Sequence, residues 1–371
     1  MFKKLYSIDF SLYLIPIILS ALSVALIYSL VFSTEDAELA LKQGMFALLG
    51  IGSMIVFSLI DYRSLRSIWW VFYSISIVLL GIVDLFGMAA GGAMRWIDLG
   101  FFQLQPSEIA KLGVIISLAF FFSTRIGRLS LKDYIWSFLM VVLPLVLIMK
   151  EPDLGTALVV IFIYLASLVV SKPSTKQIVI ISLTLAMIFS IFMLSVYKIG
   201  PFQGLLKDYQ RKRIFIFVDP NLDPLKDGYN VRQAQIAIGS GGLLGKGLGR
   251  GSQSQSKFLP KAHTDFIFAG AGEALGFVGS GILVLMYIYL VTKLYSVAKV
   301  ARDSFGMLLA IGVGAMIFFQ AVINIGMNLG LAPATGIPLP FLSNGGTAMI
   351  IYFALIGIVQ SIYMRHKRLR L

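Results

Sequence analysis

The chain has 371 residues, of which 58% are hydrophobic and 13% charged, with a formal net charge of +13 and no cysteine. Soluble globular proteins have about 25% charged residues, so the composition excludes an ordinary soluble domain, and the lack of cysteine excludes disulfides and thiol chemistry. Apolar windows of about 20 residues recur along the chain, long enough to cross a hydrocarbon core. The short alternating segments of a membrane β-barrel are absent. We predict an all-α polytopic membrane protein that does not bind nucleic acid.

The first apolar segment, residues 11–32, follows Lys3 and Lys4. It is too long for the apolar region of a signal peptide, and no small-residue cleavage site follows it, so we expect a retained first helix. We predict about ten transmembrane helices in a single membrane domain spanning residues 1–371. The predicted spans are 11–32, 43–60, 67–88, 106–124, 134–149, 154–170, 177–199, 264–292, 306–329 and 343–363.

The distribution of Lys and Arg predicts the orientation of these spans. Sixteen of the 31 Lys and Arg residues lie in the termini and short loops of one side. The short loops and span ends of the other side hold only Lys42, Arg95, Lys111 and Lys150. The positive-inside rule therefore places both termini in the cytoplasm. A large basic loop at about 200–263, between the seventh and eighth helices, is then extracytoplasmic, and we expect the function on that face.

Ionisable residues near the ends of two spans need an explanation, because such groups mark functional sites by default. In QPSEIAK (105–111), Glu108 and Lys111 share one helix face and can pair, so an interfacial ion pair is the plain alternative to a functional role. In EPDLGT (151–156), Asp153 can cap the following helix through its side-chain oxygen. Capping is the alternative there.

The stretch HTDFIFA (263–269) opens the eighth apolar span. Thr264 or Asp265 can cap this helix, and His263 can be a cap or an interfacial residue, so structural roles stay open for all three. A zinc site is not expected, because His366 is the other His of the chain and there is no Cys.

The large loop contains a basic stretch, DYQRKR (208–213), and a glycine-rich stretch, 239–251. Arg211 and Arg213 can hold phosphate by charge-assisted hydrogen bonds, or they can form a solvated basic face attracted to anionic lipid. The glycine-rich stretch contains Gly245 and Lys246 but lacks the required flanking residues of a P-loop. We expect it to be a flexible, turn-rich segment.

Taken together, these stretches resemble the SEDS family (shape, elongation, division and sporulation), specifically its RodA type. The ten-helix count and the large outer loop also agree with the family. Asn344 is a departure, because the family usually has Tyr before Gly345 and Gly346. The matching stretches follow the family's order and are GAMRWIDLG (92–100), QPSEIAK (105–111), PDLGT (152–156), DYQRKR (208–213), IAIGSGG (236–242), HTDFIFA (263–269) and GIPLPF (336–341).

The resemblance implies a peptidoglycan glycosyltransferase at the outer face of the bacterial plasma membrane. It would polymerise lipid II, a disaccharide-pentapeptide on undecaprenyl diphosphate, into β-1,4 glycan strands for cell elongation and shape. The implied partners are a class B penicillin-binding protein, the elongation machinery and membrane lipids. By match to the family, Asp265 is the essential catalytic carboxylate. The residues expected to bind substrate or line the central outer cavity are Glu108, Lys111, Arg95, Asp153, Arg211, Arg213, His263, Thr264 and Ser343.

This chemistry agrees with the residue types. A carboxylate can take the proton of an acceptor sugar hydroxyl, so Asp265 is the candidate general base. The donor carbon passes through an oxocarbenium-like state. The departing lipid diphosphate needs positive charge from Lys111, Arg95, Arg211, Arg213 or a divalent cation such as Mg²⁺ or Mn²⁺. One base combined with cations predicts inversion at the donor carbon.

Three alternatives stay open. Ten helices with broken segments also suit a lipid II flippase or transporter, and Asn324 and Asn328, four residues apart, are the residues that most favour it. A non-catalytic scaffold of the elongation machinery is the second. The third is the division-specific FtsW-type polymerase, although the short termini favour the RodA type.

Overall fold

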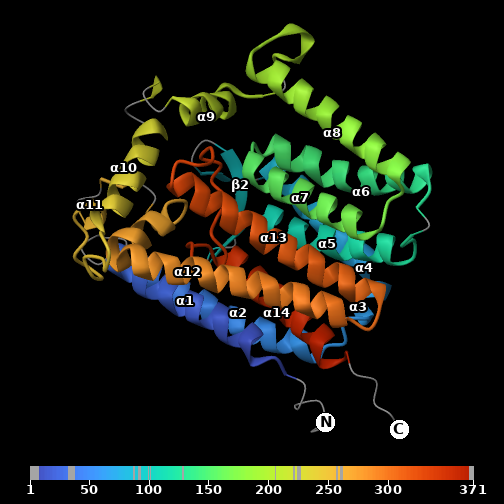
Figure 1. The fold of residues 1–371 in the computed structure, drawn as a ribbon, viewed down its shortest axis with the longest axis horizontal. Helices are drawn as coiled ribbons and strands as arrows, with labels where there is room; N and C mark the ends of the chain where they lie inside the picture. The colour runs from blue at the N-terminus through green and yellow to red at the C-terminus, as the bar shows by residue number, and fades with distance from the viewer. Residues whose placement is uncertain are drawn as a thin grey trace.

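The computed structural model of the chain is a bundle of long helices (Figure 1). It describes residues 8–31, 38–86, 88–90, 93–98, 100, 102–127, 129–204, 206–219, 222–223, 227–255, 258–259 and 262–366. Some of the cations that predicted the orientation lie outside these ranges, namely Lys3, Lys4, Arg128, Lys367, Arg368 and Arg370.

Ten helices coincide with the ten predicted spans. Eight of them have the length and hydropathy to cross a membrane, and two, α4 and α7, are shorter apolar helices. The predicted all-α polytopic fold class is therefore confirmed. The ten helices are α1 (Phe10–Val31), α2 (Glu38–Leu59), α4 (Trp69–Phe86), α5 (Pro106–Ser123), α6 (Leu131–Lys150), α7 (Leu154–Val170), α8 (Thr175–Val196), α12 (Ile267–Val300), α13 (Ser304–Asn328) and α14 (Gly346–Met364).

The connections carry smaller elements. Three antiparallel strands in the order β1-β2-β3 form a small sheet between α4 and α5, with Ala90 opposite Ala93 and Ile97 opposite Leu104. Sequence patterns did not predict this sheet, because strands of this length show no clear apolar period. The remaining elements are α3 (Ser64–Ser67), β1 (Met88–Ala90), β2 (Ala93–Asp98), β3 (Gln103–Leu104), η3 (Gly200–Phe202), α9 (Asp208–Val218), α10 (Asp227–Ser240) and α11 (Ser252–Gln255).

The helix α8 lies at the edge of the bundle, whereas α5 and α14 are its most buried long helices (Figure 1). Only Ser195 and Val196, at the end of α8, are buried among its residues. An apolar groove of about 350 Å³ separates α8 from α6 and α7. Hydrogen bonds secure α8 near its two ends, from Gln177 to the carbonyl of Leu129 (2.6 Å) and from Arg211 to the carbonyl of Val196 (2.8 Å).

Polar contacts gather several helix ends at one end of the bundle. Asp9, before α1, pairs with Lys293 near the end of α12 at 3.1 Å. Arg365, after α14, donates to the carbonyl of Leu59 at the end of α2 (2.7 Å). The start of α1 therefore lies beside the end of α12, away from the start of α12, and the end of α14 lies beside the end of α2. The assignment of this end to the cytoplasm stays a prediction.

Candidate active site

Asp265 lies in the turn of residues 262–266 that leads into α12. It borders a cavity of about 20 Å³ whose other walls come from α9, α10, α13 and the segment between α13 and α14. That volume is about enough for one water molecule. The residues that line it are Arg213, Asn230, Asp265, Phe266, Met327, Ala334 and Gly336.

Two opposite charges lie close to the Cβ position of Gly336. A Cβ built on Gly336 would lie 3.6 Å from Oδ2 of Asp265 and 3.9 Å from Nη1 of Arg213. The φ of Gly336 is 74°, in the left-handed region that favours glycine. The candidate base and a cation from the large loop thus face the same small cavity, and the missing side chain of Gly336 leaves room for both groups.

The turn that carries Asp265 is held through the carbonyl groups of three consecutive residues. The donors are the main-chain amide of Asn344 for His263 (2.9 Å), the hydroxyl of Ser343 for Thr264 (2.7 Å), and the side-chain amides of Asn324 and Asn328 for Asp265 (3.0 and 3.2 Å). His263 and Thr264 therefore contribute to this framework through their main chain.

Ser343 joins the Asp265 turn to the last long connection of the fold. Its hydroxyl also accepts a hydrogen bond from the amide of Leu339 (2.9 Å), and its carbonyl accepts one from Gln43 on α2 (3.2 Å). Asn344 takes part through its main-chain amide. Because any residue except proline supplies that amide, the departure from the family's Tyr preserves this bond.

Asp153 and Arg95 secure the start of α7. Asp153 caps α7, with Oδ1 accepting from the amide of Thr156 (3.0 Å) and Oδ2 from its hydroxyl (2.8 Å), so the predicted cap is confirmed. A Cβ at Gly155 would lie 3.0 Å from the carbonyl oxygen of Thr335, so α7 begins tightly against the segment that leads into Gly336. Arg95, on β2, donates to the main-chain carbonyls of residues 151 and 152, which precede the cap.

Glu108 and Lys111 form the predicted pair on α5, with 2.7 Å between Nζ and Oε1. The pair is fully buried rather than interfacial, since the side chains are 1% and 0% exposed. The Lys111 ammonium also lies 5.5 Å from the ring centroid of Tyr352, a cation–π distance. Among the described residues, Oε2 of Glu108 has no hydrogen-bond partner. A buried ion pair adds little net stability, so it is poorly explained as a stabilising feature alone.

Arg211 lies against the end of α8, away from the cavity that Arg213 lines. Its guanidinium donates to the carbonyl of Val196 (2.8 Å) and to Asp208 (3.1 Å), and it is not among the described residues that line the Asp265 cavity. Lys198 also binds Asp208, and this ammonium is the largest cause that lowers the pKa of the Asp208 carboxyl. The structure thus separates the two arginines of the basic stretch: Arg213 borders the cavity and Arg211 secures α9 to α8.

The glycine-rich stretch is turn-rich, as predicted, and main-chain hydrogen bonds dock it onto α12. The axis of α12 breaks at Gly276 (φ 69°, ψ −169°), which leaves amides and carbonyls that need partners. The stretch supplies them on both sides of the break. Its amides at 246 and 247 donate to the carbonyls of 273 and 274 (3.0 and 3.0 Å), and its carbonyls at 242 and 243 accept from the amides of 277 and 278 (2.8 and 3.1 Å).

Glu273 is a buried residue whose role the sequence did not reveal. Its Oε1 accepts hydrogen bonds from the Lys246 ammonium (3.1 Å), the Ser240 hydroxyl (3.3 Å) and the Gln253 amide (2.9 Å). The sequence signal that could have indicated this role is that Glu273 is the lone carboxylate in the apolar run of α12. It secures the large loop to the half-helix that begins beside Asp265.

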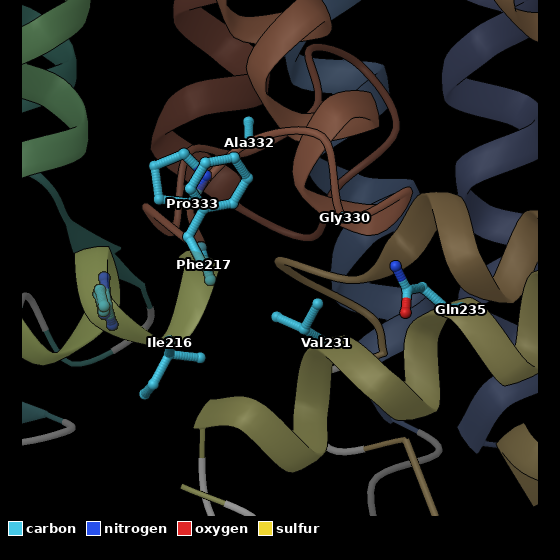
Figure 2. A pocket seen from close by; sticks show the side chains of 9 residues that line it. Ile216, Phe217, Val231, Gln235, Gly330, Ala332 and Pro333 are labelled. Atoms are coloured by element: carbon cyan, nitrogen blue, oxygen red, sulfur yellow. The ribbon is translucent and has the colours of Figure 1, made fainter. Parts of the chain in front are cut away.

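A second cavity, of about 40 Å³, adjoins the first and shares Arg213 and Ala334 with it. Figure 2 shows Phe217 from α9, Val231 and Gln235 from α10, and Pro333 around this cavity. The lining is apolar, with a guanidinium and an amide at its edges. No group of three or more His, Cys, Asp or Glu residues that could hold a metal ion occurs in the described part of the chain.

The family model described as cell cycle protein, FTSW_RODA_SPOVE, matches residues 4–368. The chain belongs to this family. It is 38% identical over 359 residues to the peptidoglycan glycosyltransferase MrdB of Escherichia coli (strain K12), a match that covers 95% of this chain and 94% of the relative. It is 31% identical to the peptidoglycan glycosyltransferase RodA of Treponema pallidum (strain Nichols), over 96% of this chain and 98% of the relative.

Solved structures agree with the family. One chain from work on the structural coordination of polymerization and crosslinking by a peptidoglycan synthase complex matches with a TM-score of 0.80 and 29% identity, over 97% of this chain and 98% of that chain. The rod shape determining protein RodA of Thermus thermophilus matches with a TM-score of 0.70 and 26% identity, over 97% and 98%. The predicted family resemblance is confirmed.

Proposed function

We propose that this chain is a RodA-type peptidoglycan glycosyltransferase that polymerises lipid II, with Asp265 as the general base. The observation that carries the proposal is the placement of the Asp265 carboxylate and the Arg213 guanidinium at one small cavity, both within 4 Å of the Cβ position of Gly336. A base and a cation at one cavity are what transfer of a sugar from a lipid diphosphate to a hydroxyl requires. The names of the relatives support the same activity.

In this mechanism the acceptor hydroxyl donates its proton to Asp265 as its oxygen attacks the donor carbon. The bond from that carbon to the diphosphate breaks, and Arg213 stabilises the negative charge that develops on the leaving group. Attack from the face opposite the leaving group inverts the donor carbon, from the α-linked donor to a β-1,4 glycan. In this mechanism the other residues of the turn 262–266 hold the Asp265 carboxylate in place and take no part in the proton transfer.

The sugar would enter from the second cavity, beside Phe217 and Pro333. Both cavities are water-sized in this structure, so α9, α10 and the segment 330–336 must part to admit a disaccharide. Apolar ring faces suit the C–H faces of a sugar, while Arg213 and Gln235 at the edges suit its polar substituents. Phe217→Ala should therefore raise the KM for lipid II.

The outward orientation and the partner belong to the proposal too. The excess of Lys and Arg in the short loops of one side supports a cytoplasmic location of both termini, which turns the Asp265 end outward. A class B penicillin-binding protein is the proposed partner, since one matching structure comes from a peptidoglycan synthase complex. A divalent cation at the diphosphate stays a prediction, because the described residues around Asp265 do not form a resident metal site.

The test is polymerisation of labelled lipid II by the purified protein, resolved on gels. The cognate partner is added with its transpeptidase inactivated, with and without EDTA and Mg²⁺. Wild type should give glycan ladders, and Asp265→Asn and Asp265→Ala should give none while remaining folded. Asp208→Asn is the control, because Asp208 is an exposed carboxylate of the large loop, and this variant should keep activity. Ladders in both Asp265 variants would move the base elsewhere, and no ladders from wild type under any condition would reject the polymerase.

The alternative hypothesis of a lipid II flippase or transporter was favoured mainly by two asparagines of α13. Asn324 and Asn328, the residues that favoured it, are fully buried and bind main-chain groups rather than forming a polar track. Translocation of labelled lipid II by proteoliposomes that depends on Asp265 would revive it.

A further inference from the structure

Two buried amides on α13 bind the main chain on both sides of the Asp265 cavity. Asn324 donates to the carbonyl of Asp265 (3.0 Å) and to the carbonyl of Ile337 (2.8 Å). These carbonyls belong to the turn before α12 and to the segment that contains Gly336. Both protons of the Asn324 amide are therefore used, and one side chain clamps two walls of the cavity to each other.

Asn328, one turn further along α13, holds the start of α12. Its Oδ1 accepts a hydrogen bond from the amide of Ala269 (3.1 Å), so a residue of another helix caps α12. Its Nδ2 donates to the carbonyl of Asp265 (3.2 Å) and to the carbonyl of Asn324 (2.8 Å). Asn324 and Asn328 are both 0% exposed, so water does not compete for these bonds.

We propose that Asn324 and Asn328 are positioning residues for glycosyl transfer. They set the Asp265 carboxylate relative to Gly336 and Arg213 by fixing the main chain on either side of the cavity. The inference rests on the proposed function, because it assumes that Asp265 is the base. It goes beyond that function by assigning a role to two residues that do not line the cavity themselves.

The physical reason is that a general base works only within hydrogen-bond reach of the proton it takes. A shift of about 1 Å in such a group reduces the rate by about 10²-fold. An alanine at 324 or 328 leaves the Asp265 carbonyl with one donor fewer and opens a space beside it. The turn can then move while the rest of the bundle keeps its packing.

The experiment compares Asn324→Ala and Asn328→Ala with Gln177→Ala. Gln177 is a matched control, because its amide also fixes a loop carbonyl, that of Leu129 at 2.6 Å, and it does not line the Asp265 cavity. Steady-state polymerisation gives kcat and KM for lipid II, and hydrogen exchange reports each segment. Both Asn variants should lower kcat about 10- to 100-fold with KM little changed. Exchange should rise in 262–270 and 336–345 and not elsewhere, while Gln177→Ala should keep kcat.

Each outcome decides the inference. If wild type polymerises lipid II, the Asp265 variants are inactive and the Asn variants keep full kcat, the positioning role is wrong and the proposed function stands. If wild type does not polymerise, the proposed function fails, and local exchange still decides whether the clamp exists. Exchange that rises over the whole chain would reject a local role. If an alanine variant does not fold, Asn→Ser at the same position keeps one donor and one acceptor, and should give an intermediate kcat.

Discussion

Lys246 and Glu273 form an ion pair of 3.1 Å that joins the glycine-rich stretch to the first half of α12. The Glu273 side chain is 0% exposed and that of Lys246 is 29% exposed. The pair therefore sits at the border of the core, where removing one partner leaves a buried charge without its counter-ion. It links the loop that carries α10 and α11 to the helix that begins at the candidate active site.

Lys246→Met should lower the free energy of unfolding by about 2–4 kcal/mol, because the buried carboxylate loses its cation. The double variant Lys246→Met with Glu273→Gln should recover part of this loss. Denaturant unfolding in detergent micelles measures both. Lys42→Met is the control, because Lys42 and Glu38 form an exposed pair on α2, whose loss should change stability by less than about 1 kcal/mol. Equal effects of the two Met variants would contradict the buried role of Glu273.

Gly276→Ala should destabilise the protein by more than about 2 kcal/mol, since a non-glycine residue is strained at this φ of 69°. The added Cβ would also overlap the main chain of Gly245 in the docked stretch. Gly281, further along α12, has open space around its Cβ position. Gly281→Ala should be neutral or stabilising by up to about 1 kcal/mol. Thermal unfolding of the two variants checks the pair, and similar melting temperatures would show that the stretch does not dock at the break.

Ser343→Ala should reduce polymerisation by about tenfold, because the turn that carries Asp265 loses a donor and can shift. Ser361 is a matched control at the other end of the bundle. Its hydroxyl donates to the carbonyl of Ile60 (2.6 Å) and accepts from the amide of Tyr62 (3.1 Å), as that of Ser343 does with its own partners, and it also accepts from Arg365 (2.7 Å). Each variant should lose about 1–3 kcal/mol of stability, and only Ser343→Ala should lose activity. Gel-resolved polymerisation and unfolding of both variants separate the two effects.

Asp9 should make stability depend on pH at the end of the bundle opposite the site. Burial acts to raise the pKa of Asp9, but hydrogen bonds from Ser11 and Lys293 outweigh it and leave the pKa below its ordinary value of 3.8. A carboxyl with a lowered folded-state pKa stabilises the fold above its unfolded pKa, and this contribution is lost as pH falls through the folded-state value. The difference in melting temperature between wild type and Asp9→Asn should therefore be constant above about pH 5. It should begin to fall near pH 3.8 and vanish only below the lowered folded-state pKa. A difference that does not change as the pH falls through this range would show that the ion pair is not its source.

Local features of this protein were predictable because they depend on residues that are close in sequence. The ten helices follow from apolar length. The cap of α7 by Asp153 and the pairing of Glu108 with Lys111 follow from helix geometry, which places residues three apart on one face. The sequence could not show that this ion pair is fully buried, because burial depends on which helices surround α5.

The tertiary structure decided which distant residues meet. Arg211 and Arg213 are two residues apart in one basic stretch, yet the orientation of α9 places Arg213 beside Asp265 and Arg211 against α8. Asn324 and Asn328 were visible as a polar pair, but their partners, the main chain of Asp265 and Ile337, lie on other segments. Spacing along a helix sets which residues share a face, whereas the packing of segments far apart in sequence sets what that face touches. The apolar length of each span was therefore readable from the sequence alone, and the arrangement around Asp265 required the fold.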